Sequence, residues 1–548
     1  MKGVEVVAKI LKQEGAEYLF CYPMHWLIEA CAKEGIRPIL CRQERVGMAM
    51  ADGFSRTTNG ERVGVFAMQQ GPGAENAFPG AAQAFSDCVP ILLLPGGVPT
   101  ERSFISPEFF ATDNYKNVTK WQASVNYVER IPDLMRKAYY QLRTGKGGPV
   151  LLELPMDILD AEFNGEIGYK VVSGNKFQPD QDEVQQIATV LLSSKNPVIH
   201  AGQGCMYADA TDELLEFAEI LDAPVMTTLP GKSSFPENHP LSLGASAVST
   251  TKQIVNFLQD SDLVFGIGTS FTKTGYGKRI PNPNEKIIIH STNDLNDINK
   301  DYQADYSLVG DAKLTLKALI NEIKNQSSGS GRVVKTSPSV ELEKLKNEWL
   351  NEWESELNSE ELPMNQYRII SELMKNVDPE NTIVTHDAGS PRDQVVPFWK
   401  SISPRTYIGW GKSTQLGYGL GLIMGAKLAD PEKLCINIMG DAAIGMVGMD
   451  LETAVRNKIG IITIVFNNGV MAIERKTMPY AHEKYSTLDE GGDYAKVADG
   501  LGVWSRRVET PEEFVDALNE AKNVTSSGRP ALLDCIVKEG YKFSHPRE

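Results

Sequence analysis

The chain has 548 residues, of which 42% are hydrophobic and 23% are charged, and its formal net charge is −16. A chain of this size exceeds a single hydrophobic core and predicts two to four domains, while the acidic balance disfavours binding to nucleic acid or to an anionic membrane surface. No apolar run reaches the roughly 18 residues that a membrane-spanning helix needs. These exclusions leave two classes of protein, an enzyme that acts on small molecules or an assembly protein.

The chain opens with MKGVEVVAKILKQEGAEYLF, in which charged residues interrupt the apolar positions. This pattern predicts an amphipathic helix and not a signal peptide. The seven cysteines include no Cys-x-x-Cys pair, which predicts reduced, mostly buried thiols. We therefore expect a cytoplasmic protein.

Apolar runs bounded by Gly or Pro then alternate with helical periodicity along the chain. They lie at 62–68, 89–97, 149–155, 196–204, 262–268, 286–291, 382–387, 434–441 and 460–468. Because these runs are apolar at consecutive positions, they suit strands covered on both faces. The fold class predicted is α/β, with three doubly wound parallel-sheet domains.

Composition changes mark the domain boundaries. We expect a first domain at 1–165 and a central domain at 180–324. A Ser/Gly tract, NQSSGSGR at 325–332, and a charged helix form the connection 325–360, and a third domain follows at 361–548.

Two strand ends of the third domain carry polar side chains, in the stretch IMGDAAIGMVGMDLETAVRNKIGIITIVFNNG. Asp441 follows one apolar run and Asn468 follows the next. Ligands of parallel α/β sheets bind at the carboxyl ends of strands, and carboxylate and amide oxygens suit Mg²⁺. The small residues Ala442 and Ala443 leave room for a diphosphate at the following helix start.

The spacing of these residues carries a family resemblance. Gly440-Asp441, followed 27 positions later by the second residue of an asparagine pair, resembles the motif of thiamine diphosphate-dependent enzymes of the acetolactate synthase, pyruvate oxidase and pyruvate decarboxylase group. The resemblance implies that Asp441, the Asn468 side chain and the main-chain carbonyl of Val470 hold Mg²⁺, which anchors the diphosphate.

The first block matches the pyrimidine-binding domain of that family. Glu44 precedes Ala51, Gly53 and Arg56 in the family's glutamate and Ala-x-Gly-x-x-Arg pattern, which implies that Glu44 is the catalytic acid. Such an acid needs an apolar, partly dehydrated site that keeps its proton near neutral pH. The resemblance also implies cofactor contacts from Gly71, Pro72, Gly73 and Asn76.

The third block matches the diphosphate-binding domain. Leu416, before Gly417-Tyr418-Gly419, occupies the position of the apolar residue beneath the cofactor. Gly389 and Ser390 occupy the place of a Gly-Gln diphosphate contact. The family pairs the first domain of one subunit with the third of another, which implies a homodimer or homotetramer with active sites between subunits.

Two departures from the family pattern bear on function. Gly268 to Thr274 lacks the arginine and acidic residues that accompany flavin in acetolactate synthases, so we expect no FAD. Pro23-Met24-His25 stands where relatives carry Pro-Gly-Gly or Pro-Gly-Asp beside the cofactor. Pro23 is expected to contact the cofactor and His25 to move protons, with His386 and His482 as further candidates.

The function expected is carbon–carbon bond cleavage or formation, in which a 2-keto acid is decarboxylated and then protonated or passed to an aldehyde or keto acceptor. The segment EGIR, at 34–37, also resembles oxalyl-CoA decarboxylases and 2-hydroxyacyl-CoA lyases, so an acyl-CoA substrate is the alternative. A hypothesis of another class is a non-catalytic relative that keeps the fold. Whether a nucleotide binds the central domain stays open.

Overall fold

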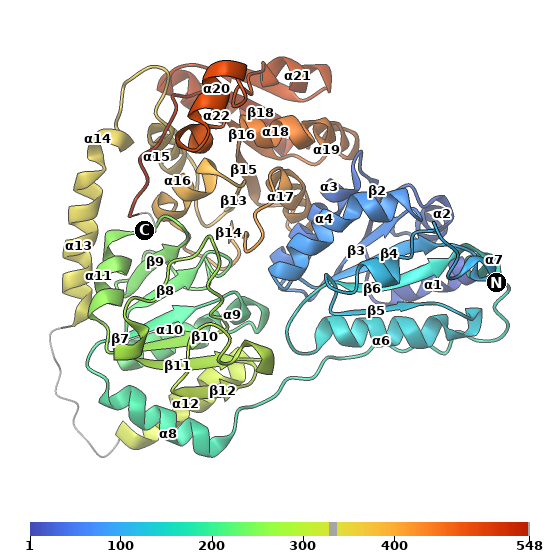
Figure 1. The fold of residues 1–548 in the computed structure, drawn as a ribbon, viewed down its shortest axis with the longest axis horizontal. Coiled ribbons are helices and arrows are strands. Elements are labelled where there is room, and N and C mark those ends of the chain that lie inside the picture. The colour runs from blue at the N-terminus through green and yellow to red at the C-terminus, as the bar shows by residue number, and fades with distance from the viewer. Residues whose placement is uncertain (328–336, 546–548) are drawn as a thin grey trace.

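The structure is a computed structural model that describes residues 1–327 and 337–545. Three α/β bodies, each built on a six-stranded parallel sheet, follow one another along the chain (Figure 1). The predicted fold class is confirmed, and each of the nine apolar runs contains a strand. The predicted domain boundaries stay a prediction.

The first sheet has the order β2-β1-β3-β4-β6-β5. Its strands are β1 (Tyr18–Tyr22), β2 (Arg37–Leu40), β3 (Gly64–Met68), β4 (Ile91–Gly97), β5 (Trp121–Ser124) and β6 (Val150–Pro155). Its helices are α1 (Gly3–Gln13), α2 (His25–Lys33), α3 (Glu44–Thr57), α4 (Pro72–Ser86), α5 (Ala111–Asn114), α6 (Ile131–Arg143) and α7 (Met156–Asp160). Every residue of β3, β4 and β6 is buried, as consecutive apolar positions predict.

The central sheet has a different order, β12-β11-β10-β7-β8-β9. Its strands are β7 (Pro197–Ala201), β8 (Val225–Thr228), β9 (Ser242–Ser246), β10 (Leu263–Ile267), β11 (Ile287–Thr292) and β12 (Tyr306–Val309). Its helices are α8 (Gln181–Ser193), α9 (Gly204–Tyr207), α10 (Thr211–Leu221), α11 (Lys252–Asp260) and α12 (Ala312–Ser327). The direction of winding reverses between β10 and β7, which is where ligands bind in sheets of this order.

The connection to the third domain differs in part from the prediction. The first three residues of the predicted 325–332 linker belong to α12, where the Gln326 amide donates to the Gln185 carbonyl (3.1 Å) and accepts from the Thr189 hydroxyl (3.0 Å). The rest of that tract lies outside the described residues. The charged segment then forms α13 (Pro338–Glu352) and α14 (Glu354–Leu357), and α13 stands against α11 of the central domain (Figure 1).

The third sheet, of order β14-β13-β15-β16-β18-β17, repeats the topology of the first. Its strands are β13 (Thr382–His386), β14 (Tyr407–Ile408), β15 (Leu434–Gly440), β16 (Ile462–Asn467), β17 (Trp504–Val508) and β18 (Ala531–Ile536). Its helices are α15 (Gln366–Asn376), α16 (Ser390–Phe398), α17 (Tyr418–Ala429), α18 (Asp441–Val447), α19 (Leu451–Asn457), α20 (Pro479–Tyr485), α21 (Tyr494–Gly500) and α22 (Pro511–Ser526).

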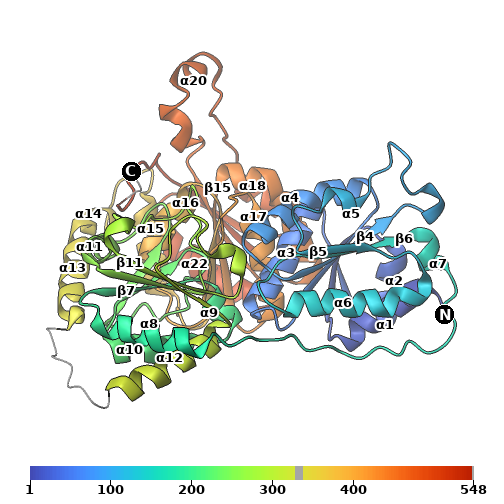
Figure 2. The ribbon, with the colours of Figure 1, turned by 60° about the horizontal axis from the view of Figure 1, so that its bottom comes forward.

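The first and third domains share one hydrophobic cluster, which contains Phe54 of α3, Leu422 of α17 and Met439 of β15. Figures 1 and 2 both show α3 and α4 beside α17. None of the helices within 1–327 and 337–545 combines the length and the apolar character that crossing a lipid bilayer demands.

Candidate active site

One edge of the third sheet gathers three predicted site segments. β13, β15 and β16 are neighbouring parallel strands, so their carboxyl ends lie at one edge. Gly389 and Ser390 follow β13, Asp441 follows β15, and Asn468 follows β16. The structure therefore brings these segments together at one edge of the sheet.

Asp441 ties the two neighbouring strand ends together. Its buried carboxylate accepts hydrogen bonds from the backbone N–H groups of Ala442 (2.9 Å), Asn468 (3.0 Å) and Gly469 (2.6 Å). Burial raises the pKa of Asp441, and these three hydrogen bonds oppose that rise. Ala443, in the first turn of α18, is fully buried, so its small side chain is matched to tight packing at this point.

The two asparagines of the pair have different surroundings. The buried Asn467 amide donates to the carbonyl of Gly492 and to Asp534 Oδ1, both at 2.9 Å, so its side chain holds the fold. The half-buried Asn468 accepts from the Val470 N–H through Oδ1 (3.0 Å). Of the two asparagines, Asn468 is therefore the more accessible at the carboxyl edge of the sheet.

This donor set fits Mg²⁺. Asp441, Asn468 and the Val470 carbonyl offer one carboxylate and two neutral oxygens, which are hard ligands. In the described part of the chain, no three His, Cys, Asp or Glu side chains are grouped to hold a metal ion. A cation at this edge would therefore need additional oxygens, such as those of a diphosphate.

The first sheet gathers the other predicted residues at its own carboxyl edge. β2, β1 and β3 are neighbours, and they are followed by Glu44, by Pro23 with His25, and by Gly71 respectively. Gly71 has φ +62°, a conformation that favours glycine, and begins the turn into α4.

Glu44 is the first residue of α3, and its side chain is only 5% exposed. Burial raises the pKa of Glu44, and a hydrogen bond from the Asn76 side chain partly opposes this rise. Gly73 lies close by, since a Cβ at that position would be 3.5 Å from Glu44 Oε1. The carboxyl group therefore has the dehydrated surroundings that a proton donor near neutral pH requires.

The histidine candidates differ in accessibility. His25 is exposed and lies edge-on to Trp26 at 5.4 Å between ring centroids. His386 is fully buried and stacks on Trp410 at 5.1 Å, and burial lowers its pKa to about 3. His386 is thus a neutral packing residue. His482 lies on α20 with Nδ1 3.8 Å from Asp489.

The first and third domains pack together through helices α3 and α17 (Figure 2). Glycines allow the helix backbones to touch, because a Cβ at Gly53 would lie 1.9 Å from the Leu422 carbonyl oxygen and one at Gly421 would lie 2.5 Å from that of Val46. Arg45, next to Glu44, donates to the carbonyl of Leu416. Leu416, the residue expected beneath the cofactor, therefore lies beside the start of α3 of the same chain. The predicted sharing of the site between subunits stays a prediction.

A buried ionic network lies at the same junction. The Arg56 guanidinium, 1% exposed, donates to both carboxylate oxygens of Asp52, to Asp87 Oδ2 (3.0 Å) and to the Gly409 carbonyl (3.2 Å). Asp87 also accepts from the N–H groups of Gly411 and Lys412 in the third domain. The motif arginine thus joins the first domain to the loop that leads to Leu416.

Asp387, which sequence reasoning did not single out, fixes the other end of that loop. Its fully buried carboxylate accepts from the N–H groups of Ala388 (2.8 Å), Gly417 (2.8 Å) and Gly419 (2.9 Å). Burial raises its pKa to about 6. The sequence signal for Asp387 is an aspartate directly after an apolar strand, the same position that Asp441 has after β15.

Comparisons with known proteins agree with this arrangement. Three family models match the chain: the thiamine pyrophosphate enzyme N-terminal TPP binding domain over residues 1–116, the central domain over 184–319 and the C-terminal TPP binding domain over 387–535. The probable acetolactate synthase large subunit of Methanocaldococcus jannaschii is 31% identical over 98% of this chain and 92% of its own length. The chain belongs to the thiamine pyrophosphate enzymes.

Other relatives of this thiamine pyrophosphate enzyme carry the same kind of name. The probable acetolactate synthase large subunit of Methanococcus aeolicus is 30% identical over 98% of this chain and 92% of its own length. The large subunit of acetolactate synthase isozyme 3 of Escherichia coli is 26% identical over 100% of the chain and 96% of its own length. The family resemblance is confirmed, and with it thiamine diphosphate as the cofactor of the family. Thiamine diphosphate and thiamine pyrophosphate are the same molecule.

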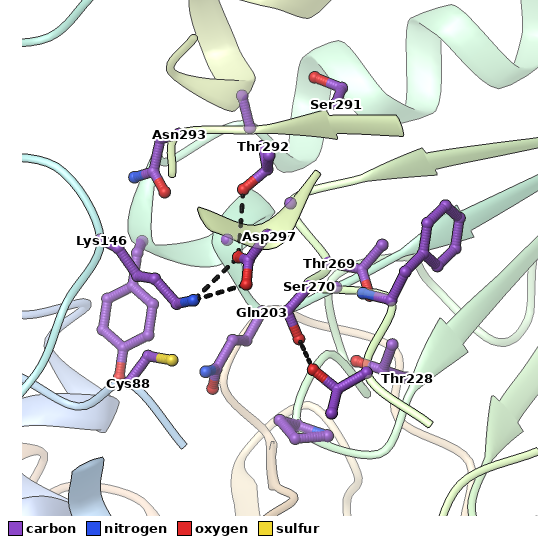
Figure 3. Close-up of a pocket in the computed structure, with 18 of the residues that line it drawn as sticks. Cys88, Lys146, Gln203, Thr228, Thr269, Ser270, Ser291, Thr292, Asn293 and Asp297 are labelled. Atoms are coloured by element: carbon purple, nitrogen blue, oxygen red, sulfur yellow. Dashed lines mark hydrogen bonds and ion pairs between the residues drawn. The ribbon is translucent and has the colours of Figure 1, made fainter. Parts of the chain in front are cut away.

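The central domain of this enzyme holds a cavity of about 220 Å³ at the winding reversal between β7 and β10 (Figure 3). Lys146 of the first domain forms an ion pair there with Asp297, at 2.8 Å. Buried polar atoms of His200, Gln203 and Ser291 have no hydrogen-bond partner among the residues that the structure describes. Gly268 to Thr274 supplies part of the lining. The predicted absence of FAD stays a prediction.

Proposed function

We propose that this chain is a thiamine diphosphate- and Mg²⁺-dependent enzyme that decarboxylates a 2-keto acid and passes the remaining fragment to a proton, an aldehyde or a keto acceptor. The observation that carries the proposal is the carboxyl edge of the third sheet, where the buried Asp441 carboxylate holds the ends of two neighbouring strands together through the N–H groups of Asn468 and Gly469. The relatives named acetolactate synthase support a keto acid as substrate.

Each predicted site residue has a role in the proposal. Asp441, Asn468 and the Val470 carbonyl hold Mg²⁺, and Gly440, Ala442, Ala443, Gly389 and Ser390 surround the diphosphate. Gly71, Pro72, Gly73, Asn76, Pro23 and Leu416 hold the ring system. Bound thiamine diphosphate would supply the electron sink for the carbanion that decarboxylation produces.

The protein's own part is proton transfer and orientation. Glu44 gives and takes back a proton at its carboxyl oxygen, and burial favours its protonated form by raising its pKa. Exposed His25, at the neighbouring strand end, is placed to exchange protons with a substrate carbonyl or hydroxyl. The proposal gives His386 no such part, because it is buried against Trp410.

A homodimer or homotetramer with active sites between subunits remains part of the proposal. Apolar side chains are exposed near the third-domain edge: Met446 and Met449 are each 51% exposed, and α20, which projects from the body in Figure 2, presents Tyr480 and Tyr485. Large exposed apolar side chains suit contact with another protein surface.

The test is a titration of the full-length apo-protein with thiamine diphosphate and Mg²⁺, followed by separate additions of pyruvate, oxalyl-CoA and a 2-hydroxyacyl-CoA. Carbon dioxide and products are measured by mass spectrometry. Turnover of pyruvate supports the proposal, and turnover of only an acyl-CoA replaces it with the alternative. Absence of cofactor binding would point to a non-catalytic relative.

A further inference from the structure

The loop that carries Leu416 connects β14 to α17 and comprises residues 409–417. Its backbone is held in part by the first domain. The N–H groups of Gly411 and Lys412 donate to the two carboxylate oxygens of Asp87, at 3.0 and 3.1 Å. The shape of this third-domain loop is therefore set in part from across the domain junction.

One peptide group of this loop is held on both sides. Its carbonyl, from Leu416, accepts from the Arg45 guanidinium in the first turn of α3. Its N–H, from Gly417, donates to Asp387 Oδ1 at 2.8 Å. A cation thus lies at the oxygen end of the peptide dipole and an anion at its hydrogen end, an arrangement that strengthens both hydrogen bonds.

A glycine makes the orientation of this peptide group easy to change. Gly417 has φ +84° and no Cβ, so the group could turn over at a lower steric cost than beside any other residue. Turned over, its carbonyl oxygen would face the Asp387 carboxylate, and its N–H would face the Arg45 guanidinium. Both contacts would be repulsive, so the two charges favour the observed orientation.

Arg45 and Asp387 also influence each other across the peptide group. Arg45 is half-buried, and burial lowers the pKa of its guanidinium, while the charge of Asp387 opposes this fall. The fully buried Asp387 accepts from two further N–H groups, those of Ala388 at 2.8 Å and Gly419 at 2.9 Å. Asp387 is thus fixed within the third domain, whereas Arg45 reaches the loop from the first.

We infer that Arg45 is a positioning residue, which holds the peptide group between Leu416 and Gly417 against Asp387 and so keeps Leu416 in its place beneath the cofactor. The Leu416 side chain is only half-buried, so its direction depends on the backbone that carries it. The role toward the cofactor rests on the proposed function, whereas the holding of the loop does not.

The first measurement needs no cofactor. Backbone hydrogen exchange of the full-length apo-protein is followed by mass spectrometry in Arg45→Met, which removes both the donor and the charge. Exchange in segment 411–417 should become about tenfold faster or more, because a charge-assisted hydrogen bond is lost. Segment 382–386, which forms β13, should be unchanged and controls for global unfolding. Arg42→Met, which breaks an exposed ion pair to Glu452 between the same domains, should leave 411–417 unchanged.

The second measurement tests whether Arg45 acts through Leu416. With thiamine diphosphate and Mg²⁺ at saturation, exchange of the proton on the reactive ring carbon for deuterium is timed by acid quench and NMR, so no substrate is needed. Arg45→Met and Leu416→Ala should each slow this exchange by about tenfold or more, because a misplaced group loses the productive geometry. The double variant should be no slower than Leu416→Ala alone, since a residue that acts only through Leu416 has nothing left to position.

Three results would overturn the inference: unchanged backbone exchange of 411–417 in Arg45→Met, unchanged ring-proton exchange in that variant, or equal slowing by Arg45→Met with and without the Leu416 side chain. If Arg45→Met does not fold, Arg45→Gln, whose shorter side chain carries no charge, replaces it with the same expectations. Wild-type protein that binds no thiamine diphosphate would refute the proposed function, and with it the role of Leu416 beneath the cofactor, whereas the first measurement would still decide whether Arg45 holds the loop.

Discussion

Replacing Arg56 by methionine should destabilise the junction of the first and third domains severely. Asp52 and Asp87 are both fully buried, and Arg56 is the cation that contacts the two of them. Removing one partner of a buried ion pair leaves an uncompensated charge, which typically costs about 3 to 5 kcal/mol. Asp52 would keep the Tyr418 hydroxyl (2.8 Å), and Asp87 would keep Gln83 and two backbone N–H groups, so the loss should lie near the lower value.

The assay is urea denaturation followed by tryptophan fluorescence, because Trp410 lies beside Tyr418 at 5.3 Å between ring centroids and reports on this junction. The matched control is Arg42→Met, which removes an exposed ion pair to Glu452 between the same domains and should cost about 1 kcal/mol or less. The variant Arg56→Met/Asp52→Asn should recover about 1 to 3 kcal/mol of the loss, since one stranded charge is gone.

The effect of pH gives the reasoning a second check. Stranded carboxylates have folded-state pKa values above their unfolded values, so the loss in Arg56→Met should shrink as the pH falls and they take up protons. A loss no greater than that of Arg42→Met, at every pH, would refute the claim that this network holds the domains together.

Three further predictions concern the proposed site. Glu44→Gln should lower kcat by about 100-fold or more while the Kd for thiamine diphosphate changes little, and unchanged turnover would contradict the role of Glu44. If sites lie between subunits, co-assembly of Glu44→Gln chains with Asp441→Ala chains should restore up to about a quarter of wild-type activity. Random pairing makes half of the dimers mixed, and each mixed dimer has one intact site out of two. Sites formed within one chain would give no recovery. Asp387 has a pKa raised to about 6, so its ionised form costs stability above that pH. As the pH falls from 6 towards 4, wild-type protein should therefore gain free energy of unfolding relative to Asp387→Asn by up to about 1.4 kcal/mol per pH unit, measured by urea denaturation at each pH; a constant difference would show that Asp387 titrates normally.

Most of the fold prediction rested on local sequence patterns, namely runs of consecutive apolar residues. Runs such as 434–441 and 460–468 are apolar at consecutive positions, and both contain strands with their polar ends at one edge. β14, with two residues, and β5, whose residues are only partly buried, lack such a run and were not foreseen. Residues 325–327 of the predicted linker tract belong to α12 instead, because Ser and Asn composition does not reveal that Gln326 is held by the neighbouring helix α8.

The proximity of Asp441 and Asn468 was predictable because each follows an apolar strand of one parallel sheet. The contacts of Asp387 were not, since its partners Gly417 and Gly419 lie about 30 residues away in a turn outside the predicted strands. The histidines show the same limit: His25 and His386 both lie at strand ends, but His386 is buried against Trp410 and Tyr407 and His25 is exposed.

The identical strand orders of the first and third sheets give every strand in one a counterpart in the other. Glu44 begins the helix after β2, and Tyr418 begins the helix after β14, the strand in the same place. Likewise Pro72, after β3, corresponds to Asp441, after β15. A unit of this topology that paired with its own copy would have offered two equal half-sites. Here the counterparts differ, since Glu44 corresponds to Tyr418, and Asp441 of the proposed Mg²⁺ site corresponds to Pro72, so a change at either position needs no matching change at its counterpart.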